Sequence, residues 1–233
     1  VLHASPLRGV KPTQIAKGPK TQEEINKLII RTRDLVQIKI EISPVLRGTV
    51  YAPETRSICE RAEEEFGFAM MPVVSFPDLY AGKIVAALSR QHPRDLFDIY
   101  QLLDTQEITA DLRTAFIVYL ISQDHPPDKL LAGTCRDISH DYEHGFAGMA
   151  DTNLSIEALV DAHARLTKDL VDNMPLEHKE FLASFYLREP GWNLLSVSGC
   201  DKLPAVRWRE LNLDRAGEGA RDQIVEKLRD VLS

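Results

Sequence analysis

Several signatures that define whole classes of protein are missing from this 233-residue sequence. It contains no Gly-x-x-x-x-Gly-Lys-[Ser/Thr], Gly-x-Gly-x-x-Gly or Gly-x-Ser-x-Gly run, so P-loop, dinucleotide-binding and serine-hydrolase functions have no support. Its longest apolar run, Ala115–Ile121, is far shorter than the roughly 20 residues that span a bilayer. The 3 cysteines are too few and too widely spaced for a disulfide framework, which favours buried thiols in a reducing cytoplasm.

Charge is unevenly distributed along the chain. The net charge is −7, yet residues 1–40 contain more Lys and Arg than Asp and Glu. The total argues against a general nucleic-acid-binding protein, while the basic segment remains able to meet phosphates. The alternative is an ordinary solvated surface, because Lys-rich segments are common.

The composition, with 44% hydrophobic and 27% charged residues, is that of a globular protein. The pattern predicts an α+β, mainly helical fold, with a sheet region over residues 1–76 and a helical domain over 77–233. Leu35–Ser43 alternates strictly between β-branched and polar residues, which indicates a half-buried strand. Two more strands are expected over Leu46–Tyr51 and Met70–Phe76.

Capping residues and 3.6-residue periodicity predict the helices. Thr21 with Glu24 has the spacing of a capping box, with Ile25, Leu28 and Ile29 as the apolar side. Ser75, Pro93 and Thr109 begin further helices. The expected helices are, in order, a short one from Thr21, Ser57–Phe66, one from Ser75 to Leu88, Arg94–Leu103, one from Thr109 to Ser122, Asp137–Met149, Ser155–Val171, Leu176–Leu187 and Gln223–Leu232.

Glu41 is the first residue with candidate chemistry, and Lys39 lies beside it on the polar face of the predicted strand. A carboxylate in that position can hold a metal or accept a proton. The competing interpretation is a surface ion pair worth under about 1 kcal/mol.

Lys83 is the second candidate, because it falls at the edge of an apolar helix stripe where its ammonium can neutralise a phosphate. The segment after it contains Arg94, Asp95 and Asp98, which share one flank of a helix. In a functional interpretation Asp95 fixes Lys83 or a metal-bound nucleotide, while Arg94 and Asp98 brace the geometry. In the alternative, purely structural interpretation, Lys83 is an ordinary lysine at the edge of the core, and the aspartates only stabilise a helix N-terminus.

Three histidines complete the candidates. His140 and His144 have the i,i+4 spacing of a zinc pair, but the metalloprotease motif is not met because the residue after His140 is Asp141. His163 lies on an apolar stripe and is predicted to be a satisfied core residue. Trp192 and Trp208 are predicted to be packing residues.

Three segments together resemble the AbiEii/AbiGii toxin family of nucleotidyltransferases. They are Ile38–Ile42 (IKIEI), Asp78–Leu88 (DLYAGKIVAAL) and Arg90–Asp98 (RQHPRDLFD), and the tail Leu203–Trp208 is also similar. The likeness extends over roughly residues 30–210. It implies a partial polymerase-β-like nucleotidyltransferase sheet followed by a C-terminal helical bundle.

The resemblance also implies a function: a bacterial toxin of the toxin–antitoxin or abortive-infection type that transfers NMP from an NTP to an RNA acceptor such as tRNA. By that likeness Glu41, Lys83 and Asp95 are catalytic, Glu41 holds Mg²⁺, and Lys39, Arg94 and Asp98 contact substrate. The implied partners are the NTP, tRNA and a cognate antitoxin, in the cytoplasm and without a membrane. An exposed sheet edge would allow homo-oligomers.

One family feature is missing. The family has a Gly-Gly or Gly-Ser turn followed by Asp-x-Asp before the strand of Glu41, and this sequence contains neither. Hard cations need several oxygen ligands, so a single carboxylate cannot organise a two-metal site. We therefore expect the chain to be the C-terminal portion of a nucleotidyltransferase toxin and to be inactive by itself. The alternative is a non-catalytic protein- or RNA-binding helical module.

Overall fold

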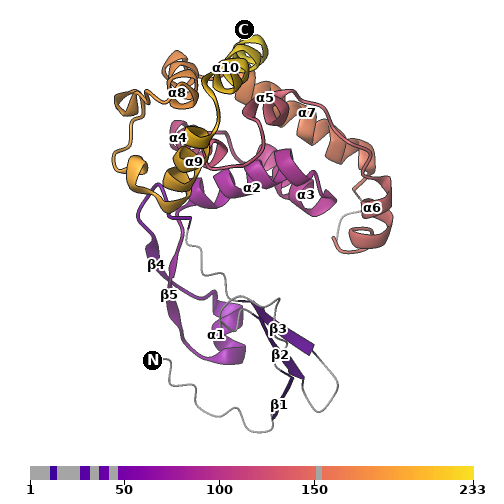
Figure 1. Ribbon diagram of the computed structural model, residues 1–233. Coiled ribbons are helices and arrows are strands. Elements are labelled where there is room, and N and C mark those ends of the chain that lie inside the picture. Colours follow the sequence, from indigo (N-terminus) through magenta and orange to yellow (C-terminus); the bar gives the residue numbers. More distant parts are fainter. Residues whose placement is uncertain (1–10, 15–26, 32–36, 42–46, 151–153) are drawn as a thin grey trace. The chain divides into compact units, whose positions relative to one another are not determined.

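A computed structural model describes residues 11–14, 27–31, 37–41, 47–150 and 154–233 (Figure 1). The chain forms two compact units, residues 1–46 and residues 47–233. The fold is α+β and mainly helical, as predicted. Its described helices are α1 (Glu60–Phe66), α2 (Phe76–Arg90), α3 (Pro93–Thr105), α4 (Ala110–Ile121), α5 (Pro127–Leu131), α6 (Ser139–Gly145), α7 (Ile156–Asp172), α8 (Leu176–Tyr186), α9 (Pro204–Arg215) and α10 (Glu218–Leu232).

The first unit contains an antiparallel sheet of three strands, in the order β1 (Lys11–Gln14), β2 (Lys27–Arg31) and β3 (Gln37–Glu41). The strand predicted around Glu41 is confirmed as β3. The helix predicted after Thr21 is wrong in its described part, because Lys27–Arg31 pairs with β3 along its whole length. Cross-strand pairing here overrides a local helical pattern. Thr21, Glu24 and Ile25 lie outside the described residues.

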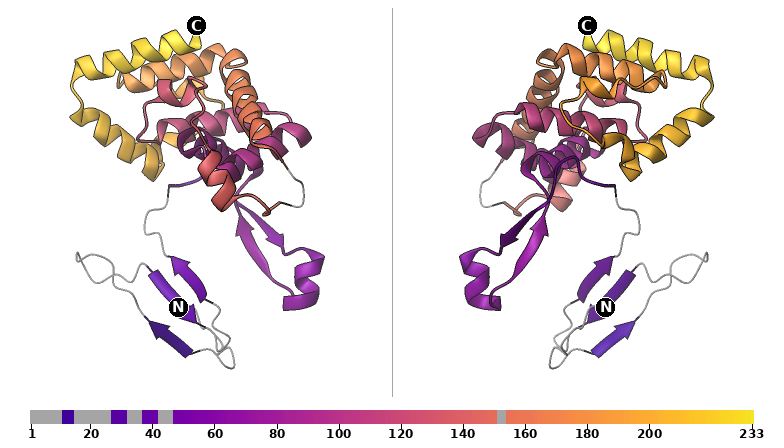
Figure 2. Two further views of the ribbon diagram at one scale, coloured as in Figure 1. Left: turned by 90° about the vertical axis from the view of Figure 1, so that its right-hand side faces the viewer. Right: turned by 90° about the vertical axis from the view of Figure 1, so that its left-hand side faces the viewer.

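A hairpin of two antiparallel strands opens the second unit. Strands β4 (Glu54–Ser57) and β5 (Met70–Val73) carry α1 between them, and Figures 1 and 2 show this hairpin extending from the helices with α1 at its far end. β5 is the predicted strand in shorter form, whereas the predicted helix from Ser57 begins only at Glu60. No residue of β4, α1 or β5 is buried.

The hydrophobic core lies among the helices that follow. α2 packs against α4 and α3, α3 packs against α7, and α10 covers α8 and α5 (Figure 2). α4 is buried on most sides, as its continuous apolar sequence predicts. The caps predicted at Ser75 and Thr109 are confirmed, since each hydroxyl accepts a hydrogen bond from a backbone N–H of the first turn.

The strand predicted over Leu46–Tyr51 is not formed in its described part, residues 47–51. The Asp78 carboxylate accepts hydrogen bonds from the N–H groups of Val50 at 2.7 Å and Tyr51 at 3.0 Å, which leaves these groups unavailable to a neighbouring strand. Gly48 has φ +85°, a backbone conformation that strains any residue with a side chain and therefore favours glycine. These contacts join residues 48–51 to α2 and to the segment before α9.

Other differences concern the C-terminal half. α5 and α9 were not predicted, and α6 ends at Gly145, so the exposed Met149 lies beyond it. Among the thiols only Cys200 is buried, and Cys59 is exposed, contrary to the expectation of three buried thiols. Trp208 is 47% exposed and is not a packing residue. In the described part of the chain no helix is long and apolar enough to cross a membrane.

Candidate active site

Lys83 owes its position to the way α2 begins. The Ser75 hydroxyl caps the helix and also donates a 2.7 Å hydrogen bond to the buried carboxylate of Asp78. With this end fixed, Ile84 and Val85 turn into the core. Lys83 emerges at the boundary, where 30% of its side chain is exposed and its ammonium lies 5.8 Å from the centre of the Tyr80 ring. A cation in this position is stabilised by a cation–π interaction with the Tyr80 ring and remains accessible to solvent.

Asp95 and Asp98 owe their positions to the start of α3. The His92 ring accepts a hydrogen bond from the N–H of Arg94, and Pro93 occupies the first helical position. Proline suits this position because its missing N–H would have no helical partner. Leu96 and Ile99 are fully buried, so Asp95 and Asp98 lie at the edge of the buried face.

Two ion pairs join α2 to α3, one from the middle of α2 and one from its C-terminal end. Lys83 Nζ lies 2.5 Å from Asp98 Oδ2, and Arg90 lies 2.8 Å from Asp95 Oδ1. The structure therefore brings Lys83 to Asp98, and the contact between Lys83 and Asp95 that the functional interpretation allowed is not made. The geometric reason is that Asp98 lies one helical turn further along α3 than Asp95.

One oxygen of this cluster has no partner. Asp95 Oδ2 is buried and accepts no hydrogen bond from the described residues, which is costly for a carboxylate unless a cation or donor occupies the space beside it. This oxygen is chemically suited to Mg²⁺. Across the described residues, however, no three His, Cys, Asp or Glu side chains are grouped to hold a metal. Asp95 alone does not fit a bound Mg²⁺.

A clamp from a distant segment fixes the turn between α2 and α3. Gln91 has the left-handed φ of 51°, and its amide donates to Thr134 O at 2.8 Å and accepts from the N–H of Arg136 at 2.7 Å. The Arg136 guanidinium donates to the carbonyl of Arg90 at 3.1 Å. The same guanidinium bonds Asp141 at 2.5 Å and lowers the pKa of that carboxyl.

Arg94 braces the structure through a partner that the sequence analysis did not identify. Its guanidinium donates two hydrogen bonds, at 3.2 and 3.1 Å, to the carbonyl of Gly145 at the end of α6. Arg94 thus holds α6 against α3, and its contact with substrate stays a prediction.

The histidines are arranged differently from a zinc site. The rings of His140 and His144 stack with centroids 4.4 Å apart, and the Nδ1 of His144 lies 3.0 Å from the carbonyl of His140. His163 is 1% exposed, which confirms that it is a core residue. Neither of its ring nitrogens has a partner in the part of the chain that the structure describes, so it is not the satisfied histidine that the sequence predicts. Burial lowers its pKa.

The strand candidates belong to the other unit. The structure places Lys39 and Glu41 on β3, where Lys39 is exposed and Glu41 is paired in register with Lys27. The side chain of Glu41 lies outside the described residues. Its grouping with Lys83 and Asp95 stays a prediction.

Arg90, Gln91 and Arg136 were not recognised as parts of the site. A left-handed glutamine gives no signal in a single sequence, since this backbone conformation is expected of Gly or Asn. The contacts of Arg136 connect residues 45 and 46 positions apart in sequence, so no local pattern reveals them.

The structure is thus a mainly helical α+β fold in which a charged cluster joins the consecutive helices α2 and α3. The family described as nucleotidyl transferase AbiEii toxin, type IV toxin–antitoxin system, matches residues 5–196. The chain belongs to this family of nucleotidyltransferase toxins. No curated protein and no solved structure shows a significant match.

Proposed function

We propose that this protein takes part in transfer of a nucleoside monophosphate from an NTP to a hydroxyl of an RNA acceptor such as tRNA. Membership of the AbiEii family supports the reaction type, and the resemblance of the segments around Glu41, Lys83 and Asp95 supports these residues as participants. The observation that carries the proposal is the ion pair between Lys83 of α2 and Asp98 of α3, one helical turn from Asp95, whose buried Oδ2 has no partner among the described residues. Such a toxin would meet tRNA in the cytoplasm.

The proposed step is a displacement at the α-phosphorus of the NTP. The acceptor hydroxyl oxygen forms a bond to this phosphorus, the bond to the bridging oxygen of the β-phosphate breaks, and pyrophosphate leaves with the electron pair. The hydroxyl proton passes to solvent or to a carboxylate base. Lys83 binds the β- and γ-phosphates and offsets the charge that develops on the leaving group.

Binding of the nucleotide requires Lys83 to exchange partners. Its ammonium is paired with Asp98 in the structure, and both side chains are about one third exposed, 30% and 32%. An exposed ion pair is weak, at most about 1 kcal/mol. A triphosphate can therefore replace Asp98 as the partner of Lys83 at little cost in free energy. Until a nucleotide binds, Asp98 holds the lysine side chain in place.

The metal-binding carboxylates are the missing part of this proposal. The sequence has no Asp-x-Asp pair, and the described residues form no cluster of three ligands. We expect the 233-residue chain by itself to be inactive or nearly so. Incubation with Mg²⁺, labelled NTPs and total tRNA tests this expectation, and robust transfer of label would overturn it.

The role of Lys83 is tested separately from turnover. Lys83→Ala should weaken binding of an NTP about tenfold or more, because a phosphate loses its charge-assisted contact. Lys129→Ala removes an exposed lysine of α5 and serves as the matched control. In growth assays of the complete reading frame, Lys83→Ala and Asp95→Ala should relieve growth inhibition while the protein stays folded. Unchanged inhibition by both variants would exclude catalysis at this cluster.

A second candidate function is a non-catalytic binding module for a protein such as a cognate antitoxin, or for a second copy of the chain. The hairpin favours it, because four large apolar side chains are more than half exposed there, Phe66, Phe68, Met70 and Met71. In this case growth inhibition would survive Lys83→Ala and Asp95→Ala but not polar substitution of these four residues.

A further inference from the structure

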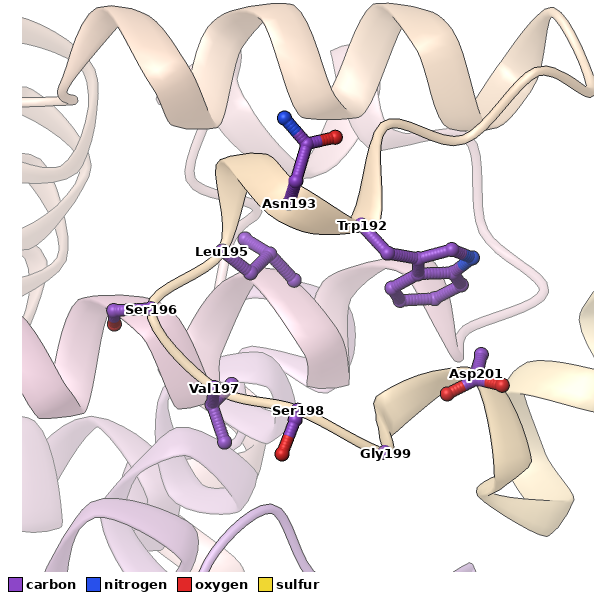
Figure 3. Close-up of a pocket in the computed structure, with 8 residues that line it drawn as sticks. All are labelled: Trp192, Asn193, Leu195, Ser196, Val197, Ser198, Gly199 and Asp201. Carbon is purple, nitrogen blue, oxygen red and sulfur yellow. The ribbon is translucent and has the colours of Figure 1, made fainter.

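A hollow forms within the loop that joins α8 to α9, away from the residues discussed above. It is open to solvent, has a volume of about 450 Å³ and is lined by eight residues, Trp192, Asn193, Leu195, Ser196, Val197, Ser198, Gly199 and Asp201. Figure 3 shows the loop curving round it, with the Trp192 indole and Asp201 on the same side. This volume is within the usual range for small-molecule sites, about 300–1,000 Å³.

The loop is held in shape from several directions. The Trp192 ring packs against Phe181 and Phe185 of α8, with centroids 5.1 and 6.2 Å away. The hydroxyls of Ser196 and Thr114 lie 3.3 Å apart and join the loop to α4. A ligand would therefore find the hollow already formed and would lose little free energy in ordering it.

The chemistry of the hollow is that of a receptor for a positive charge. Trp192 supplies the aromatic ring with the strongest attraction for cations. Within the described part of the chain, the carboxylate of Asp201 has no hydrogen-bond or ion-pair partner. Arg207 donates instead to the backbone carbonyl of Asp201, at 3.3 Å. Gly199 has φ +83°, a conformation that favours glycine, and it begins the 3₁₀ turn (Cys200–Lys202) that carries Asp201.

We propose that this hollow binds an organic cation, an ammonium or guanidinium group on a short alkyl chain, between the Trp192 ring and the Asp201 carboxylate. Leu195, which is 5% exposed, contributes apolar lining for the alkyl part. The net charge of −7 favours approach of a cation over that of an anion. The group is carried either by a free amine or by a Lys or Arg side chain of a polypeptide.

Fluorescence of Trp192 tests the proposal in the full chain. The sequence has 2 tryptophans, so the exposed Trp208 is first replaced, Trp208→Phe, to leave Trp192 as the only indole. Putrescine and agmatine should change its emission saturably, and 1,4-butanediol, which has no charge, should not. Asp201→Asn should weaken binding at least about tenfold, as expected for loss of a partly desolvated charge pair. Asp104→Asn, which removes an exposed acid of α3, should leave the affinity unchanged.

The two sources of the cation are separated by a peptide. A capped Gly-Arg-Gly peptide is compared with its citrulline analogue, which is neutral. Binding of agmatine indicates a free amine, and binding of the arginine peptide alone indicates a polypeptide side chain. Equal effects of putrescine and 1,4-butanediol, unchanged affinity in Asp201→Asn, or absence of saturable change with all cations would overturn the proposal. None of these results bears on nucleotide transfer, because the residues of that site are not altered.

Discussion

The helical bundle and the hairpin of β4, α1 and β5 differ in how far their side chains are buried. In the bundle, fully buried residues such as Leu96 and Phe116 fill a shared core, whereas every residue of β4 and α1 keeps some contact with solvent. Two strands alone are marginally stable in water. The stability of the second unit therefore resides in the helices that carry Lys83 and Asp98, and the hairpin depends on its attachment to them.

Removal of one phenylalanine from each region should give the largest contrast. Phe116→Ala in α4 creates a cavity and should lower the free energy of unfolding by about 3–5 kcal/mol. Phe68→Ala, at a position 65% exposed, should change it by less than about 0.5 kcal/mol. Urea denaturation followed by circular dichroism measures both. Similar losses in the two variants would show that the hairpin contributes to the core.

Asp78 tests how firmly the bundle holds the segment that leads into the hairpin. Asp78→Asn weakens the carboxylate contacts with the N–H groups of Val50 and Tyr51 and should cost about 2–3 kcal/mol. Amide hydrogen exchange should quicken at these two residues. Asp104→Asn is the control, as its carboxylate is exposed. Unchanged exchange at Val50 would mean that something other than Asp78 anchors the segment.

Much of this division could be foreseen from the sequence. Ser75, Pro93 and Thr109 have local cap geometry, so the beginnings of α2, α3 and α4 could be predicted. The β2 strand could not, because Leu28 and Ile29 also suit a helix and only pairing with β3 decides between the two. In the site, residue types were foreseen but partners were not: whether Lys83 meets Asp95 or Asp98 depends on the angle between two helices.

Mild acid should weaken the bundle through its buried histidines, whereas the hairpin contains no histidine of its own to titrate. Burial holds the pKa of His163 below 6.5 in the folded chain. Above pH 6.5 both states are neutral there. Below it the unfolded chain binds a proton that the folded chain does not, so the free energy of unfolding falls by about 1 kcal/mol per pH unit until the folded pKa is reached.

His163→Leu should remove this part of the acid sensitivity and should not reduce stability at pH 7, because both ring nitrogens lack partners. His178 is also buried and has a lowered pKa, so some pH dependence should remain. Urea titrations at pH 7 and pH 5.5 measure the difference. An equal fall in parent and variant would contradict the assignment to His163.

The smallest effect is expected from the ion pair within β4. Arg56 lies 2.7 Å from Glu54, but both side chains are about 60% exposed, 63% and 59%. Arg56→Ala should therefore change the unfolding free energy by less than about 0.5 kcal/mol, and added salt should erase the difference. Arg113→Ala in α4, whose partner is Asp169 of α7, is the contrasting variant and should cost more because Arg113 is 12% exposed.

The left-handed turn at Gln91 couples the packing of α2 against α3 to the segment around Thr134. A residue other than glycine keeps this backbone conformation only while something compensates for about 1 kcal/mol of strain, and the segment around Thr134 does so. If a bound molecule drew that segment away, the joint would relax and the spacing between Lys83 and Asp98 would change with it. A surface more than 40 residues downstream would then regulate whether the lysine is held or released.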